Sequence, residues 1–392
     1  MKLSPRKNCT GCAACRDVCS VGAVSMAADE EGFPYPVIDA SKCVGCGRCR
    51  AVCPALAGLK PRTPQRSLAV RARDLELRTA SSSGGVFSLL AERVLSSGGV
   101  VFGAVWTRDW NVVHAKAETL SELAAIRGSK YLQSNLEGVY AEVRAELAKG
   151  RRVMFTGTPC QVAALKRFLR DDDSGLLAVE IMCHAAVSPK AWHSYLRARG
   201  EEWKPGSGSG DVASGIVGVT FRDKSAGWSK SAIRLTFADG KVYRCGHHDD
   251  FYMCAYGAHL STRPSCHACR MRGFRSGADV TMGDFWGVGD HHPELMDDRG
   301  VSAVFVHTTA GREAVEAILG SCDFTETEPE RVAVWNRILY LSAKAHSERH
   351  EFLCRVGDEN FDRLFLELVH RPRKSVFRRI FERIFKRGGA KS

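Results

Sequence analysis

Apolar residues occur along most of the chain in short runs, and their spacing distinguishes strands from helices. Compact apolar runs that end in glycine or polar residues predict strands, whereas apolar residues three and four positions apart predict helices. The predicted strands are 100–106, 111–117, 151–158, 176–184, 278–287 and 300–308, with a hairpin over 233–245 that turns at Asp239-Gly240. The predicted helices are 84–99, 135–150, 159–169 and 188–200. After its first sixty residues the chain is therefore expected to form a mixed α/β body.

Stretches rich in proline and glycine divide this pattern into segments. Residues 59–67 are rich in Pro, Arg and Lys and are interpreted as a linker, and 206–210 (GSGSG) as a flexible loop. We predict a compact N-terminal domain and, after the linker, a body in two parts, a helical segment and a tail. Their ranges are 1–58, 68–150, 151–330, 331–370 and 371–392.

The composition is ordinary for a globular protein, with 392 residues of which 44% are hydrophobic and 26% charged. No run approaches the roughly 18 apolar residues of a membrane span. The start, MKLSPRKNC, lacks the apolar core of a signal peptide. The spacing of the sixteen cysteines favours metal binding over disulfides, which indicates a reducing compartment. We therefore expect a cytoplasmic protein.

The net charge of +12 is concentrated at the C-terminal end. Residues 371–392 contain nine Lys or Arg and one acid, so they carry +8 and leave +4 on the other 370 residues. The body lacks the basic excess of a nucleic-acid-binding face, and no nucleic-acid partner is expected. The tail sequence SVFRRIFERIFKR predicts a basic amphipathic helix. Such a helix docks on an anionic membrane surface or on a partner, or packs on its own protein, and the sequence leaves these alternatives open.

Eight of the cysteines form two runs with the same spacing, C-x2-C-x2-C-x3-C, and the second run ends in Cys-Pro. This is the pattern of bacterial two-cluster ferredoxins, in which the fourth cysteine of each run binds the other cluster. One predicted [4Fe-4S] cluster is held by Cys9, Cys12, Cys15 and Cys53, and the other by Cys43, Cys46, Cys49 and Cys19. Zinc knuckles or disulfides are the alternatives, but two identical runs argue against both.

Small residues in these runs suit the same interpretation. Gly11, Gly45 and Gly47 allow loops that offer backbone N–H groups to sulfide and thiolate. Ser20 stands where proline usually follows the fourth cysteine of the first run. Proline is not a ligand, so we expect the cluster to tolerate this change.

Cys160 and Cys183 each follow a predicted strand. Thr158 is the expected N-cap and Pro159 the first residue of a helix, which places Cys160 in its first turn. This helix start is expected either to bind a dinucleotide phosphate or to lower the pKa of Cys160, and the alternative is a buried, inert cysteine. Neighbouring parallel strands end at the same edge of a sheet, so Cys183 is expected close by.

The C-x-x-C pair Cys266 and Cys269 would complete four thiolates and hence a third cluster. On spacing alone this is a guess, because the pair lies far from Cys160 and Cys183 in the sequence. The alternative is a redox-active dithiol, although the strand–helix setting of thioredoxin is missing. Four remaining cysteines have no local partners and are expected to be ordinary thiols, namely Cys245, Cys254, Cys322 and Cys354.

Several long stretches resemble the coenzyme F420 hydrogenase/dehydrogenase beta-subunit family, including its members with a fused dicluster ferredoxin. They are SSSGGVFSLLAERVLSSGGVVFGAVW, RGSKYLQS, VMFTGTPCQVAALK, VEIMCHAAVSPKAW and RPSCHACRMRGFRSGADVTMGDFWGV, in family order over roughly residues 1–330. The resemblance implies a ferredoxin fold followed by a flavin-binding mixed α/β domain. It also implies a [4Fe-4S] cluster near FAD, held by Cys160, Cys183, Cys266 and Cys269. The family's CHG motif reads Cys183-His184-Ala185 here.

A flavin fits the two helix starts, where backbone N–H groups are free to bind phosphate. The candidate FAD residues are Ser83, Gly84, Gly85, Lys130, Thr156, Gly157, Thr158 and Gln161. No catalytic residue is assigned.

These observations predict an iron–sulfur flavoprotein oxidoreductase, because a flavin converts between one-electron and two-electron transfer. Expected partners are a redox protein or ferredoxin and a small two-electron acceptor, coenzyme F420 or similar. The main alternative is an electron-transfer subunit that feeds a partner enzyme and has no substrate chemistry of its own.

Overall fold

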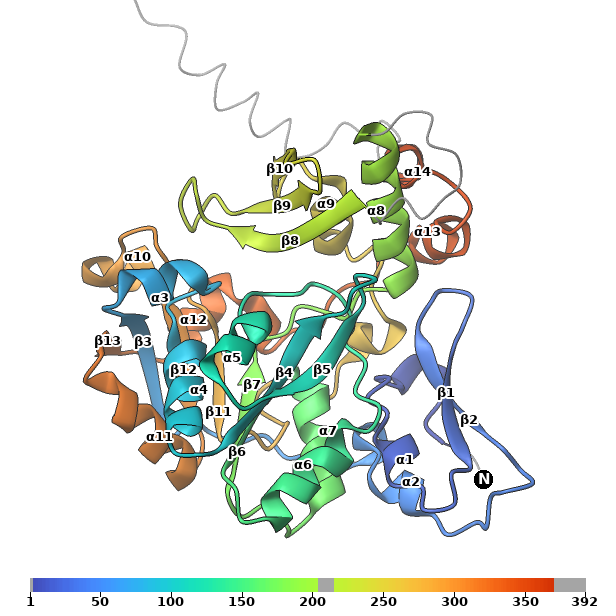
Figure 1. Cartoon of the computed structure of the whole chain (residues 1–392), viewed down its shortest axis with the longest axis horizontal. Helices are drawn as coiled ribbons and strands as arrows, with labels where there is room; N and C mark the ends of the chain where they lie inside the picture. The colour runs from blue at the N-terminus through green and yellow to red at the C-terminus, as the bar shows by residue number, and fades with distance from the viewer. Residues whose placement is uncertain (1–2, 204–214, 370–392) are drawn as a thin grey trace, which may run out of the picture.

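The computed structural model describes residues 3–203 and 215–369, and its largest element is an eight-stranded sheet (Figure 1). The strand order is β13-β3-β12-β11-β7-β6-β4-β5. The four strands β11, β7, β6 and β4 are parallel, and all other neighbours are antiparallel. The strands are β3 (Arg66–Ala72), β4 (Val100–Trp106), β5 (Val112–Ala117), β6 (Val153–Gly157), β7 (Leu176–Ile181), β11 (Val280–Asp284), β12 (Ser302–Val306) and β13 (Cys322–Glu326).

Helices cover both faces of this sheet because successive strand residues point to opposite sides. In β6, Met154 packs with one group of helices and Val153 and Phe155 with the other. The first group is α4 (Val86–Ser96), α5 (Leu120–Ile126) and α11 (Thr309–Leu319), and the second is α6 (Val139–Ala148) and α7 (Pro159–Leu169). The shorter helices nearby are α3 (Leu75–Ala80), α10 (Val288–His291) and α12 (Pro329–Trp335). The body is thus a three-layer α/β/α structure, and residues 68–150 and 151–330 contribute strands to one sheet.

A second sheet lies above the carboxyl ends of the parallel strands in Figure 1. It is the antiparallel meander β8 (Ile216–Asp223), β9 (Ala232–Phe237) and β10 (Val242–Gly246). It shares an aromatic core, which includes Trp192 and Tyr252, with helices α8 (Pro189–Trp203), α9 (Phe251–Gly257), α13 (Arg349–Arg355) and α14 (Phe361–Val369). The predicted helical segment after residue 330 contains α12, α13 and α14.

The first sixty residues form a small unit beside α6 and α7. The hairpin β1 (Val24–Ala28) and β2 (Pro34–Ile38) separates the short helices α1 (Ala14–Asp17) and α2 (Arg48–Ala51), one in each cysteine run. The tip of the hairpin is held by the body, since buried Glu31 accepts two hydrogen bonds from Arg349, at 2.6 and 3.0 Å. This attachment gives the unit a fixed position against the body.

The predicted flexible loop GSGSG and the basic tail lie outside the described residues. No helix within 3–203 or 215–369 is long and apolar enough to cross a membrane.

Candidate iron–sulfur sites

The first predicted cluster site is a cavity in the N-terminal unit. It is lined by all four of its predicted ligands, together with Thr10, Gly11 and Ala13. The backbone N–H groups of Ala55 and Leu56 interact with the Cys53 sulfur, and that of Ala14 with the Cys12 sulfur. Donors of this kind stabilise the negative charge of a bound cluster. The structure therefore brings together the set Cys9, Cys12, Cys15 and Cys53 as the spacing predicted.

The second predicted set lies at the outer end of the same unit. Cys49 interacts electrostatically with Cys46 and Cys19, and Cys43 lies with Cys46 in the loop that precedes α2. The Cys19 sulfur accepts a hydrogen bond from the backbone of Ala23 at 3.3 Å. The thiol of Cys15, from the first set, interacts with Cys49 from the second. The two sets are therefore neighbours, as in a dicluster ferredoxin.

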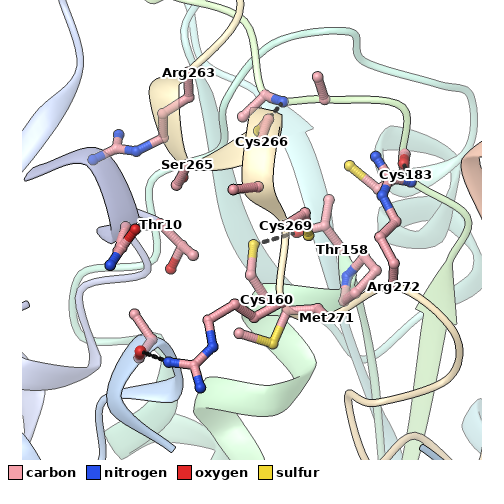
Figure 2. Close-up of a pocket in the computed structure, with 17 residues that line it drawn as sticks. Thr10, Thr158, Cys160, Cys183, Arg263, Ser265, Cys266, Cys269, Met271 and Arg272 are labelled. Atoms are coloured by element: carbon pink, nitrogen blue, oxygen red, sulfur yellow. Dashed lines mark hydrogen bonds between the residues drawn. The ribbon is translucent and has the colours of Figure 1, made fainter. Parts of the chain in front are cut away.

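The third predicted cluster site is also a cavity, which we call the third cavity. It lies between the body and the N-terminal unit, and the cysteines at 160, 183, 266 and 269 all line it (Figure 2). The cavity has a volume of about 50 Å³ and is partly open to solvent. Cys160 comes from the first turn of α7, and Cys183 from the segment after β7. The other two cysteines lie in and after the 3-10 helix η4 (Pro264–Ala268). The structure thus joins three segments that are far apart in the sequence.

Backbone pairing explains how the C-x-x-C segment reaches Cys183. Val187 and Thr262 form an antiparallel bridge, and the N–H of Arg263 donates to the carbonyl of Ala186 at 2.8 Å. In return, the N–H of Ala186 donates to the Cys266 sulfur at 3.3 Å. The segment after β7 therefore fixes the position of η4.

The start of α7 has the predicted cap, but its effect on Cys160 differs from our expectation. Thr158 is the N-cap and Pro159 the first helical residue, and the Thr158 hydroxyl lies 3.3 Å from the Cys160 sulfur. Burial nevertheless raises the pKa of Cys160 to about 12, and the nearby Cys269 and Cys266 add to this. Contrary to our expectation, the pKa of Cys160 is therefore raised and not lowered, because burial outweighs the lowering contribution of the Thr158 hydroxyl at the helix start.

Burial also raises the pKa of Cys183 well above its usual range and raises that of Cys266. Arg272 opposes both shifts, and its guanidinium donates to the carbonyls of Cys183 and His184. Arg270 donates to the carbonyls of Ala55 and Ala57 in the N-terminal unit. Buried thiolates need positive charge nearby, and these arginines supply part of it. Iron would supply the rest.

The cavity fits a cluster better than a single metal ion. Four sulfurs on one tetrahedral zinc lie roughly 3.8 Å apart, given a Zn–S distance of about 2.3 Å. Among the described residues no three His, Cys, Asp or Glu side chains are grouped closely enough to hold one ion. The four thiols instead surround the space, which suits one sulfur ligand on each iron of a [4Fe-4S] cluster.

Arg263 joins the first and third cavities. Its side chain is fully buried and donates to the Cys9 carbonyl at 2.7 Å, to Gln133 Oε1 at 3.0 Å and to the Pro34 carbonyl at 2.9 Å. It also lines the third cavity, and Thr10 lines both cavities. A single layer of residues therefore separates the two predicted cluster sites. The sequence did not predict this connection through Arg263.

The eight candidate FAD residues do not converge on one space, and of these eight only Thr158 lines the third cavity. The Lys130 ammonium donates to four carbonyls, those of Ala125, Ile126, Arg127 and Gly128, and its burial lowers its pKa to about 7. Ser83, Thr156 and Gln161 have hydrogen bonds within the protein. Gly84 lies against the Val70 carbonyl, whereas Gly85 and Gly157 lie against side chains, those of Leu77 and Phe155. At the two helix starts, the N–H of Gly84 donates to Ser302 Oγ at 3.0 Å and the N–H of Thr158 to Gln161 Oε1 at 2.8 Å, so part of the expected phosphate donors is used within the protein.

One polar group at the carboxyl edge was not predicted. Asp284, the last residue of β11, pairs with buried Arg222 at 2.8 Å and accepts from Trp228 Nε1 at 2.9 Å. The Arg222 guanidinium lies over the Trp286 ring, 5.0 Å from its centre. The position of Asp284 directly after a buried strand was the available signal, because ligands of parallel sheets bind at this edge.

Family comparisons agree with this architecture. Residues 67–141 and 150–331 match the N-terminal and C-terminal models of the coenzyme F420 hydrogenase/dehydrogenase beta subunit, which together span more than half of the chain. The chain belongs to this family. Residues 8–57 match a 4Fe-4S dicluster domain, and a second dicluster model matches residues 35–87, which overlaps the first match at 35–57. This beta-subunit family member is therefore an iron–sulfur protein with a fused dicluster unit.

Among solved structures, the chain is similar to one in the F420-reducing [NiFe] hydrogenase complex from Methanosarcina barkeri. The identity is 18%, the TM-score is 0.46, and the alignment covers 81% of this chain and 95% of that chain. No curated protein matches the sequence.

Proposed function

We propose that this protein is an iron–sulfur flavoprotein oxidoreductase. It would move electrons between three [4Fe-4S] clusters, FAD and a two-electron acceptor, coenzyme F420 or a similar compound. The observation that carries this proposal is the third cavity, where four cysteines from three separate segments meet next to the loop of the first dicluster site. When bound, the clusters supply one-electron transfer and the flavin supplies conversion to two-electron chemistry.

The protein's own residues have three tasks in this proposal. The cysteines at 160, 183, 266 and 269 would bind iron, and Arg263, Arg270 and Arg272 would offset the negative charge of their thiolates. The same arginines hold the dicluster unit against the body, since Arg263 and Arg270 donate to carbonyls of that unit. Arg272 fixes the backbone at Cys183. Binding, charge compensation and docking therefore rest on one group of side chains.

FAD enters the proposal through the resemblance to the family and through the two helix starts. Acid precipitation of anaerobically purified protein tests it directly. We expect FAD in the supernatant at a stoichiometry close to one per chain. A supernatant without flavin, from protein that has its full iron content, would contradict this part of the proposal.

An electron-transfer subunit that feeds a partner enzyme is the second candidate. This candidate is favoured by the hydrogen bonding of the candidate FAD residues, because most of their polar side chains already form hydrogen bonds within the protein. The two functions differ in turnover. An enzyme with its own flavin should reduce or oxidise a two-electron acceptor such as F420, whereas a subunit without flavin should exchange only single electrons with viologen dyes.

A further inference from the structure

The outer end of the dicluster unit carries a surface that the proposed function does not yet use. Residues 40–65 contain five Lys or Arg and no Asp or Glu. They are Lys42, Arg48, Arg50, Lys60 and Arg62, and all five are exposed. The rest of the chain outside the tail has a much more balanced charge. This concentration of positive charge therefore marks a local feature of the fold.

The second predicted cluster site lies within this basic surface. Cys46 is exposed, unlike the seven other cysteines of the two runs. Val44, two residues earlier, is 69% exposed, and Val37 at the end of β2 is 50% exposed. The loop from β2 to α2 lies at the outer edge of the molecule, on the side away from the large sheet (Figure 1). An apolar centre surrounded by charged residues is the usual form of a protein docking surface.

Local acids reduce this charge only in part. Lys42 pairs with Asp39 at 3.4 Å, and both side chains are largely exposed. Arg62 is turned toward the body, where it donates to the Gly277 carbonyl at 3.5 Å. Arg48 and Arg50 lie on the two sides of the predicted ligand Cys49, and both are exposed.

We propose that this surface, Lys42 to Arg50, docks an acidic one-electron carrier protein of the ferredoxin type. The inference rests on the proposed function, because it needs a cluster held by Cys19, Cys43, Cys46 and Cys49. In each encounter one electron passes between the carrier and that cluster, so that one is oxidised and the other reduced, with no transfer of protons or groups. Complementary charge speeds such encounters by about 10- to 1,000-fold and weakens as salt is added.

The test uses an acidic [2Fe-2S] ferredoxin as the probe, since its absorption differs from that of a [4Fe-4S] cluster. Stopped-flow mixing of the reduced ferredoxin with the oxidised full-length protein gives the second-order rate constant at several salt concentrations. The variant is Arg48→Glu/Arg50→Glu. The matched control is Arg93→Glu/Arg312→Glu, which changes two exposed arginines on α4 and α11, on the far side of the large sheet.

We expect the wild-type rate to fall as salt rises, the Arg48/Arg50 variant to be at least about tenfold slower at low salt, and the control to match wild type. Iron content and reduction by dithionite should be equal in all three proteins. The milder Arg48→Gln/Arg50→Gln variant should fall between wild type and the charge reversal, which covers the case in which the reversal disturbs cluster assembly.

Two results would overturn the docking proposal while leaving the proposed function intact. One is dithionite reduction as in wild type together with ferredoxin rates that depend on neither salt nor these arginines. The other is loss of binding to anionic vesicles in the Arg48/Arg50 variant with unchanged ferredoxin rates, which would assign the surface to membranes. Failure of dithionite to reduce any cluster would instead contradict the proposed function.

Discussion

Two equivalent glycines provide a sharp test of how the dicluster unit docks on the body. Gly11 and Gly45 occupy the same place in the two cysteine runs, and their φ angles are +67° and +72°. A Cβ at Gly11 would lie 2.5 Å from Gln133 Nε2 and 2.6 Å from Arg263 Nη1. A Cβ at Gly45 would have no described atom within 4 Å apart from its chain neighbours. Gly45→Ala is therefore a matched control for Gly11→Ala.

Both substitutions carry the same backbone strain, about 1–2 kcal/mol for an alanine in the left-handed region. Only Gly11→Ala also forces Arg263 and Gln133 aside. Arg263 cannot move without losing its hydrogen bonds to the Cys9 and Pro34 carbonyls, and such overpacking costs about 1–3 kcal/mol. We therefore expect docking of the unit to weaken about 5- to 150-fold more in Gly11→Ala than in Gly45→Ala.

Hydrogen exchange measured by mass spectrometry detects this difference in docking between the two variants. Peptides that cover β1, β2 and residues 130–135 should exchange faster in Gly11→Ala, while Gly45→Ala should match wild type there. Iron analysis of both variants shows whether the first cluster is retained. Equal exchange in the two variants would refute the inference that Gly11, Gln133 and Arg263 form the junction.

Three further predictions concern Arg263, His114 and the tail. Arg263→Lys loses the planar guanidinium that reaches three hydrogen-bond acceptors. Electron transfer from the dicluster unit to the third site should therefore slow at least about tenfold. Stopped-flow traces at the wild-type rate would count against this. Burial lowers the pKa of His114 to about 4, so the folded state resists protonation of this side chain. The free energy of unfolding therefore decreases as the pH is lowered. Relative to an ordinary His pKa near 6.5, the expected loss between pH 7 and pH 5 is about 2 kcal/mol, and His114→Asn should flatten this dependence in hydrogen exchange of the sheet. Deletion of 371–392 should abolish flotation with acidic liposomes, and equal flotation of both forms, or of neither, would argue against a membrane role for the tail.

Local sequence patterns predicted the parts of the structure that depend on neighbouring residues. The two C-x2-C-x2-C-x3-C runs specify short loops and turns, and all four ligands predicted for the first cluster line one cavity. Thr158-Pro159 predicted the start of α7 because capping is decided within one turn. The same reasoning failed for the pKa of Cys160, since burial depends on segments that are distant in the sequence.

Long-range contacts set the limit of sequence reasoning at the third site. The C-x-x-C pair reaches Cys183 through the bridge between Val187 and Thr262, and no local pattern encodes that pairing. Lys130 was expected to face a phosphate, yet its ammonium is held by carbonyls at the end of α5, a choice that depends on how the next loop folds. The buried position of Arg263 between two cavities has the same origin, because an arginine in the sequence looks the same whether it is exposed or buried.

Iron analysis of one pair of variants tests the central claim, a third cluster beside the dicluster unit, most directly. Wild type should contain about 12 irons per chain, four for each cubane, with a Mössbauer spectrum of [4Fe-4S] clusters. Cys266→Ser/Cys269→Ser should contain about 8 irons, because the dicluster ligands are eight different cysteines. The control, Cys245→Ser/Cys322→Ser, should keep the wild-type content. If Cys266→Ser/Cys269→Ser also keeps the wild-type iron content, the pair does not bind a cluster and the account of the third site is wrong.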